Sequence, residues 1–353
     1  MLIAGSGAVL SLLAEKLELS NFFVVVGVAS VFILWLLAFL LRVLFSHFNL
    51  HNAQCYGETA KKIEDAWWAS HRQKVSLREA VLVGGACSSP EHRKHLFNPD
   101  HQPPVPQSTE AGAAIRLLQV FGEDTAERER QLAMLLVLQW QVQREETVAL
   151  QPLTCYWQGS AAAWQGFVEQ MTKCFPQVEL PDEPEPWLGN QSLNSIINRL
   201  QGAPAEARIL CAGSQCSPAG LDSRLPAGEV ALLWLIAPKG GVRLSRGEWF
   251  DASSELLPTV ASRAQQQSDL QAPPQFCVSF SQPDEPHLPA QGWTISQHLQ
   301  DANFGDLERM EGMVAQTLAA SYVEQHQVPC AWLANDPHHT LTLGIVEPDD
   351  STI

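Results

Sequence analysis

A cysteine in the stretch VGGACSSPEH, Cys87, is the first candidate for chemistry. A thiolate is a strong nucleophile, but a thiol ionises near neutral pH only beside a base, a cation or a helix N-terminus. Pro90 is compatible with the first turn of a helix. The stretch that follows, EHRKHLFNPDHQPP, has no apolar period, so no buried helix is expected to activate the thiol. We therefore interpret Cys87 as a structural cysteine, and a nucleophile is the alternative.

A second arrangement lies near the C-terminal end of the sequence. Cys330 stands in PCAWLAND, and His338 and His339 follow shortly after Asp336. A histidine within hydrogen-bond reach of a thiol is the arrangement that activates a catalytic cysteine. We interpret the two histidines as part of a polar turn between two strands. The alternative is a catalytic base close to Cys330 or Asp336.

Three histidines, His92, His95 and His101, lie in a proline-rich loop together with Glu91 and Asp100. Imidazole and carboxylate groups are ligands for transition metals. No helix is expected to present these side chains on one face, so an exposed polar loop is the favoured interpretation and a metal site the alternative. The sequence contains no GxSxG, phosphate-binding glycine loop or HExxH motif, and no cofactor is expected.

The eight cysteines are irregularly spaced and form no CxxC pair. Several stand inside apolar runs, such as RILCAG and PQFCVSF, which is typical of buried free thiols rather than disulfides or a zinc site. This pattern favours a reducing compartment.

The net charge of −16 comes from residues 111–353, which contain 13 basic and 29 acidic residues. A nucleic-acid partner is not expected, because phosphate binding requires a basic surface. Anionic lipid would also repel this acidic part.

One segment is apolar enough to cross a membrane. Phe22–Leu41 contains twenty residues without a charge, and Arg42 follows it. This length spans about 30 Å of hydrocarbon as a helix. The run is too long and starts too late for a cleaved signal peptide. We expect a transmembrane helix at 21–45 in contact with lipid, after an interfacial or disordered segment at 1–20. Basic residues beyond Arg42 favour a single-pass protein of the bacterial inner membrane with its C-terminal part in the cytoplasm.

The rest of the chain is expected to form a juxtamembrane region at 46–110 and an acidic α/β body at 111–353, with a division near 181–190. The juxtamembrane region contains a helix or stalk at 51–78, in which Trp67 and Trp68 could contact lipid or a partner. Apolar runs alternate with helical periods, which indicates a mixed, largely buried sheet with helices packed on it. The expected strands are 79–83, 153–157, 208–212, 229–237, 275–280 and a pair around 337–339; the expected helices are 124–144, 161–175, 193–200, 255–265 and 306–322.

Three motifs resemble those of thiolase-like proteins, the fold of ketosynthases. PAGEVALLWLIAP (226–238) resembles the G-E-x-A-x-x-L-x-L strand of that fold, DANFGDLERMEGMV (301–314) its loop-then-helix element, and WLANDPHHTLTLGIVEP its terminal histidine-containing loop and closing strand. These enzymes place a nucleophilic cysteine at the start of a buried helix, in an ACSS context similar to that of Cys87, near histidine or asparagine. Here Cys87 follows Arg42 by only 45 residues, and Asp336 to His339 replace a glycine-rich loop. The resemblance therefore implies a degenerate thiolase-like body without its chemistry.

Two functional hypotheses follow. The leading one is a non-enzymatic adaptor or scaffold that binds an effector or a secretion-machine subunit, because the layout resembles membrane-anchored adaptors of type VI secretion loci. The alternative is a membrane-tethered acyl transferase or hydrolase that uses Cys87 or Cys330 with His338 or His339. An envelope sensor with its body outside the cytoplasm is a third possibility.

Overall fold

The computed structural model describes residues 21–144, 154–281, 292–293, 298–336 and 338–349. The chain divides after Ala69 into two units. The first contains one long helix, and the second contains the sheet and the other described helices. The predicted N-terminal segment 1–20 lies outside the described residues.

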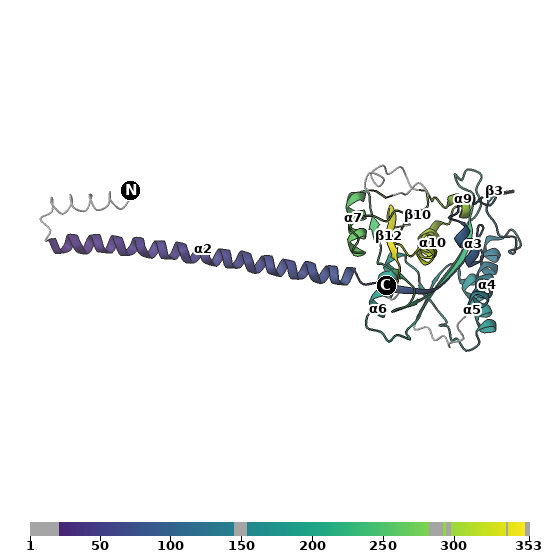
Figure 1. Cartoon of the computed structure of the whole chain (residues 1–353), viewed down its shortest axis with the longest axis horizontal. Coiled ribbons are helices and arrows are strands. Elements are labelled where there is room, and N and C mark those ends of the chain that lie inside the picture. Colours follow the sequence, from purple (N-terminus) through teal and green to yellow (C-terminus); the bar gives the residue numbers. More distant parts are fainter. Residues whose placement is uncertain (1–20, 145–153, 282–291, 294–297, 337, 350–353) are drawn as a thin grey trace. The chain divides into compact units, whose positions relative to one another are not determined.

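The first unit is built on α2 (Asn21–His71), a single helix of 51 residues (Figure 1). Within the described part of the chain, this is the one helix long and apolar enough to cross a membrane, by length and composition. Crossing itself remains a prediction. The helix continues past Arg42 without a break to His71, so the predicted juxtamembrane helix is a continuation of the apolar one.

The second unit contains a ten-stranded mixed sheet with the order β10-β11-β12-β8-β1-β7-β6-β4-β5, and β9 pairs with β12. Three neighbouring pairs are parallel (β4 with β5, β4 with β6, and β10 with β11) and the others are antiparallel. The strands are β1 (Val75–Gly84), β4 (Thr154–Gln158), β5 (Glu185–Pro186), β6 (Ile209–Cys216), β7 (Glu229–Ala237), β8 (Val242–Leu244), β9 (Glu248–Phe250), β10 (Cys277–Ser279), β11 (Cys330–Asn335) and β12 (Leu341–Glu347). A separate hairpin pairs β2 (Gln107–Thr109) with β3 (Gly112–Ala114).

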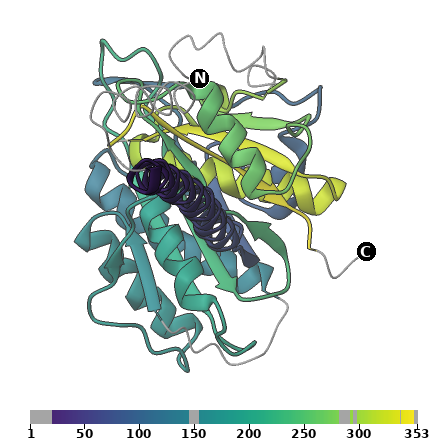
Figure 2. The same ribbon diagram turned by 90° about the vertical axis from the view of Figure 1, so that its left-hand side faces the viewer.

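The helices form layers around the two halves of this sheet. α4 (Thr125–Gln143) and α5 (Ala161–Cys174) cover the half with β1, β4, β6 and β7, and α7 (Leu257–Gln267) covers the half with β9 to β12. α6 (Asn190–Leu200) and α10 (Glu311–His326) share one core with strands of both halves. Figure 1 shows α10 between the outer helices, and Figure 2 shows the green and yellow C-terminal half on one side of the unit. The remaining short helices are α3 (Pro90–His95), α9 (Asp301–Phe304) and the 3-10 turn η1 (Glu308–Met310).

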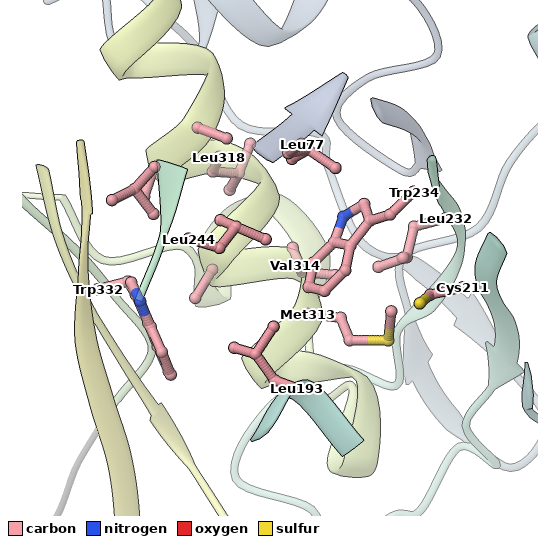
Figure 3. Packing of buried hydrophobic residues seen from close by; sticks show 14 of the residues in the cluster. Leu77, Leu193, Cys211, Leu232, Trp234, Leu244, Met313, Val314, Leu318 and Trp332 are labelled. Atoms are coloured by element: carbon pink, nitrogen blue, oxygen red, sulfur yellow. The ribbon is translucent and has the colours of Figure 1, made fainter. Parts of the chain in front are cut away.

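The composition of α10 explains its central position. Its residues from Met313 to Ala320 are all buried, so it has no polar face to present to water. A helix of this kind must pack against other elements on every side. Figure 3 shows Val314 and Leu318 among side chains of both sheet halves, with Trp234 on one side and Trp332 on the other.

The predicted α/β class, with a largely buried mixed sheet and packed helices, is confirmed. The strand predicted at 229–237 is β7, and the helix predicted at 124–144 is α4 with Asp124 as its cap. Residue 110, where the sequence predicted that the juxtamembrane region ends and the α/β body begins, lies in the turn of the β2–β3 hairpin. The division predicted near 181–190 falls on β5 and the start of α6, and β5 belongs to the large sheet.

Candidate functional site

Cys87 lies in a tight turn after β1, where its N–H and that of Gly84 bond to each other's carbonyl oxygen. The side chain is 2% exposed, and burial raises the pKa of the thiol to about 12, although the nearby Arg93 guanidinium opposes the shift. No described histidine forms a hydrogen bond with it. The following helix, α3, has only six residues. A thiol in these surroundings stays protonated at neutral pH.

Cys330 begins β11 and is also buried, which raises the pKa of its thiol well above the ordinary value. β11 pairs with β12 so that Cys330 faces Val346 and Asn335 faces Leu341. His338 and His339 therefore lie at the far end of the hairpin. Five residues of extended chain separate Cys330 from Asn335, a distance of about 16 Å. The structure does not bring Cys330 and the two histidines together.

The three histidines of the proline-rich loop have separate contacts. His92 lies on α3, the His95 ring contacts the Asn98 side chain, and His101 Nε2 lies 2.7 Å from Asn303 Oδ1. Among the described residues, no group of three or more His, Cys, Asp or Glu side chains could hold a metal ion.

The β11–β12 turn lies instead beside the start of α6. Gly189, the residue before this helix, has φ of 58° and ψ of −133°, a conformation that glycine adopts without strain. A Cβ at this position would lie 3.6 Å from Asp336 Oδ2. The next residue, Asn190, donates from Nδ2 to Thr342 Oγ1 (2.6 Å) and to the Glu248 carbonyl (3.3 Å). These hydrogen bonds therefore connect the start of α6 to the start of β12.

A cavity of about 60 Å³ occupies this junction. Its lining comes from five places in the chain: the end of β4, the segment before α6, the start of α10, the end of β11 and the turn before β12. The residues are Gln158, Trp187, Leu188, Gly189, Asn190, Arg309, Gly312, Met313, Gln316, Asn335, Asp336, His338 and Thr342.

Asp336 organises the polar side of the cavity. Its Oδ1 accepts the backbone N–H groups of His338 and His339, each at 2.9 Å, and lies 3.0 Å from His339 Nδ1. The His339 ring also stacks on Trp249 at a centroid distance of 5.3 Å. His338 lines the cavity, and its side chain remains exposed to water. A histidine and a hydrogen-bonded carboxylate are groups that can accept or donate protons in a reaction.

Glu311, the first residue of α10, lies next to this turn. Its Oε2 accepts the backbone N–H (3.2 Å) and Nδ2 (2.8 Å) of Asn335. Burial raises the pKa of this carboxyl to about 7, the hydrogen bonds from Asn335 oppose the shift, and the Asp301 and Asp306 carboxylates add to it. The carboxyl therefore changes its charge close to neutral pH.

Both central helices begin at the cavity, because Asn190 is the first residue of α6, and Gly312 and Met313 belong to the first turn of α10. A helix N-terminus carries a partial positive charge and unpaired N–H groups. Such groups stabilise an oxygen that becomes negatively charged during a reaction. The arrangement therefore combines proton-transfer groups with a region that favours an oxyanion.

Comparison with solved structures identifies the fold. The chain is similar to the ishigamide ketosynthase/chain length factor (12% identity, TM-score 0.54, 78% of this chain and 99% of the other). It is similar to the PfaC keto synthase-chain length factor (9%, TM-score 0.56, 79% and 43%) and to ketosynthase twelve of the bacillaene polyketide synthase of Bacillus amyloliquefaciens (9%, TM-score 0.51, 79% and 76%). No family model and no curated protein matches the sequence. The second unit thus has a thiolase-like fold, as the motifs predicted.

This result contradicts the hypothesis of a non-enzymatic secretion adaptor. The structures that share the fold over nearly four fifths of the chain are described as ketosynthases and chain length factors. The prediction of an adaptor from a type VI secretion locus, which was based on layout alone, is wrong.

The thiolase-like resemblance implies a cysteine at the start of a buried helix, but neither central helix has one. α6 begins after Gly189, and α10 begins after Met310. Gly189, Asn190 and Glu311 are not among the site residues predicted from the sequence. The available signal was the short stretch WLGN directly before the amphipathic period of 193–200, because a glycine before a helix permits a sharp turn.

Proposed function

We propose that the thiolase-like unit binds an acyl thioester and hydrolyses it without forming an acyl-cysteine. The observation that carries the proposal is the cavity beside Gly189, where the Asp336 turn meets the first residues of both central helices. Acyl transfer is the chemistry that the thiolase-like resemblance implies. The buried thiols of Cys87 and Cys330 argue against a covalent intermediate on either residue.

In this proposal, the thioester carbonyl lies in the cavity with its oxygen toward the first turns of α6 and α10. A water molecule attacks the carbonyl carbon while His338 accepts one proton from it. The oxygen becomes negative next to the positive ends of the helices. The carbon–sulfur bond then breaks, and the leaving thiolate takes the proton from His338 to give a carboxylic acid and a thiol.

The cavity size fits the reacting groups only. The volume of about 60 Å³ is small beside the roughly 300–1,000 Å³ of pockets that enclose a whole ligand. The acyl chain and the carrier of the thiol must extend outward from the cavity. We infer that α2 tethers this unit to a membrane, with the unit in the cytoplasm; the apolar composition of 22–41 and the basic residues beyond it support both parts of this inference.

The proposal is tested by placing a thiol at the start of α6 in the variant Gly189→Cys. If an acyl thioester binds as described, the new thiol lies next to the carbonyl and takes the acyl group. We expect intact-mass spectrometry to show one added acyl group after incubation with acetyl-CoA or a longer acyl-CoA. The wild-type chain is expected to release free CoA without a mass increase.

Gly202→Cys is the matched control. Gly202 also has a positive φ, of 72°, and a Cβ there meets open space, so this variant carries a thiol outside the cavity. Thermal unfolding establishes that both variants fold. A folded Gly189→Cys chain that acquires no acyl group, or that acquires no more than Gly202→Cys, rejects acyl-thioester binding at this site. An acylated cysteine in the wild-type chain rejects the cysteine-independent reaction.

A further inference from the structure

A second and larger cavity lies beside the end of β6. Its volume is about 590 Å³, which is in the range of pockets that enclose a whole small-molecule ligand. Its lining comes from the β2–β3 hairpin, the segment between this hairpin and α4, the first turn of α4 and the loop after β6. Arg116 is part of this lining, and we call the space the Arg116 cavity. It shares no lining residue with the cavity beside Gly189.

Two arginines of this lining lie beside one buried carboxylate. The Arg116 side chain is 11% exposed and the Arg128 side chain is 8% exposed. Both pair with Glu229, which is fully buried, at 3.6 Å and 2.8 Å respectively. No other carboxylate among the described residues forms an ion pair with either arginine, and burial raises the pKa of the nearby Cys216 thiol to about 12, which leaves it neutral. A guanidinium stays charged in proteins, so this group retains one uncompensated positive charge.

The hydrogen-bond donors of the two arginines are used to different extents. A guanidinium has five N–H donors. Those of Arg128 are all used. Arg116 donates from Nη1 to Cys216 Sγ (3.1 Å) and the Gly228 carbonyl (3.3 Å), and from Nη2 to the Ser217 carbonyl (2.8 Å). Nε and one Nη2 hydrogen of Arg116 therefore have no partner among the described residues, and a donor that is removed from water without a partner costs free energy.

The other residues of the lining favour a ligand with a single negative charge and an apolar part. Glu110 and Glu123 line the cavity and are exposed, so water screens their charges, but they would repel a dianion more than a monoanion. Leu117 and Val120 are buried beside Arg116, and Leu118 is 80% exposed. These three side chains offer an apolar surface to an aliphatic chain.

We propose that the Arg116 cavity binds a monocarboxylate with an aliphatic chain, such as hexanoate. The carboxylate accepts hydrogen bonds from the unused donors of Arg116, and its one negative charge balances the positive charge that Glu229 leaves uncompensated. The planar guanidinium matches a carboxylate, and hydrogen bonds between charged groups are stronger than neutral ones. The aliphatic chain contacts Leu117, Leu118 and Val120. This inference does not depend on the proposed reaction.

Titration of the full-length chain with hexanoate tests the proposal. The chain is placed in lipid nanodiscs at neutral pH, and the NMR linewidths of hexanoate report binding, with empty nanodiscs as the background. We expect Arg116→Gln to weaken binding at least about tenfold, because a charge-assisted hydrogen bond and the positive charge are lost. Arg224→Gln is the matched control, since Arg224 is an exposed arginine in the same loop as Pro218 and does not line the cavity. It is expected to bind hexanoate like the wild type.

A second variant leaves the buried ion pairs in place. Leu118→Asp adds a negative charge at an exposed position of the lining, and we expect it to weaken hexanoate binding at least about threefold. Hexyl phosphate, with the same chain and a larger charge, is expected to bind the wild type more weakly than hexanoate. Thermal unfolding establishes which variants fold, and Leu118→Asp decides alone if Arg116→Gln does not fold.

Three results overturn the proposal: a wild-type chain that does not bind hexanoate, a folded Arg116→Gln or Leu118→Asp chain with wild-type affinity, or hexyl phosphate that binds as tightly as hexanoate. The reaction proposed above also releases a carboxylic acid. Hexanoate that binds independently of both Arg116 and Leu118 would therefore lie outside the Arg116 cavity, and that result would leave the proposed reaction at Gly189 unaffected.

Discussion

At position 87 the chain has a thiol in apolar surroundings, and at position 189 it has a partly buried turn without a side chain. Reactivity of a cysteine depends on its pKa, and burial raises the pKa of Cys87 to about 12. The neighbouring sequence ACSS is therefore compatible with an inert residue. The groups that are available for proton transfer lie in the Asp336–His339 turn. No thiol is present there among the described residues.

The role of His338 can be tested by substitution. We expect His338→Ala to reduce the rate of acyl-thioester hydrolysis by roughly a hundredfold or more, the usual contribution of a general base. Release of free thiol, followed with a chromogenic disulfide, measures this rate. His92→Ala removes an exposed histidine on α3 and is expected to leave it unchanged. Similar rates for the two variants would show that His338 is not the base.

At the level of elements, the start of α10 contains a carboxyl whose charge depends on burial. Glu311 has a folded-state pKa of about 7, above its ordinary value of 4.5. Between these two pH values, the unfolded chain has lost the proton and the folded chain retains it. The contribution of this group to stability is therefore fully present below about pH 4.5 and falls as the pH rises to about 7.

We expect Glu311→Gln to be more stable than the wild type above pH 7, by on the order of 3 kcal/mol, and equal to it below pH 4.5. The amide oxygen can still accept the N–H groups of Asn335. Denaturant unfolding of both chains from pH 4 to pH 8 gives the difference directly. A difference that does not grow with pH would mean that Glu311 is already charged in the folded state near pH 5.

The start of β7 contains a buried ion pair that joins this strand to α4. Glu229 is fully buried and accepts from Arg128 Nε (2.9 Å) and Nη2 (2.8 Å), and from the Leu117 N–H. Removing one partner of a buried pair leaves the other charge without compensation. The contact therefore fixes β7 relative to α4.

Glu229→Ala is expected to lower the free energy of unfolding by about 3–5 kcal/mol, because Arg128 would remain buried. Glu183→Ala, which removes an exposed carboxylate in the linker before β5, is expected to change it by less than about 0.5 kcal/mol. Chemical denaturation of the full chain in detergent compares the two. Equal effects would show that Glu229 is not required for the packing of α4.

At the scale of the whole molecule, the proposed membrane tether would determine by its orientation which substrates and partners the second unit can meet. Cys55 is the one exposed cysteine among the described residues, and it stands on α2 beyond the apolar segment. We expect a membrane-impermeant maleimide to label it in bacterial cells only after the inner membrane is permeabilised. The Cys55→Ser chain provides the background. Labelling of intact cells would place the thiolase-like unit outside the cytoplasm.

The sequence by itself determined the elements with a strong local pattern. The apolar run of β7, the capped helix α4 and the uncharged stretch at the start of α2 could be recognised because periodicity and composition are local properties. The motifs around 226–238, 301–314 and 332–348 also indicated the thiolase-like fold, which the comparisons confirm.

Only the tertiary structure decided where the candidate site lies. His338 follows Cys330 by eight positions, but the pairing of β11 with β12 places the two residues at opposite ends of the hairpin. Gly189 and Asp336 are far apart in sequence, and they meet because the two sheet halves enclose α6 and α10 and bring the starts of both helices to the β11–β12 turn. Burial, which sets the pKa values of Cys87 and Glu311, is likewise a property of the packed molecule and cannot be obtained from neighbours in the chain.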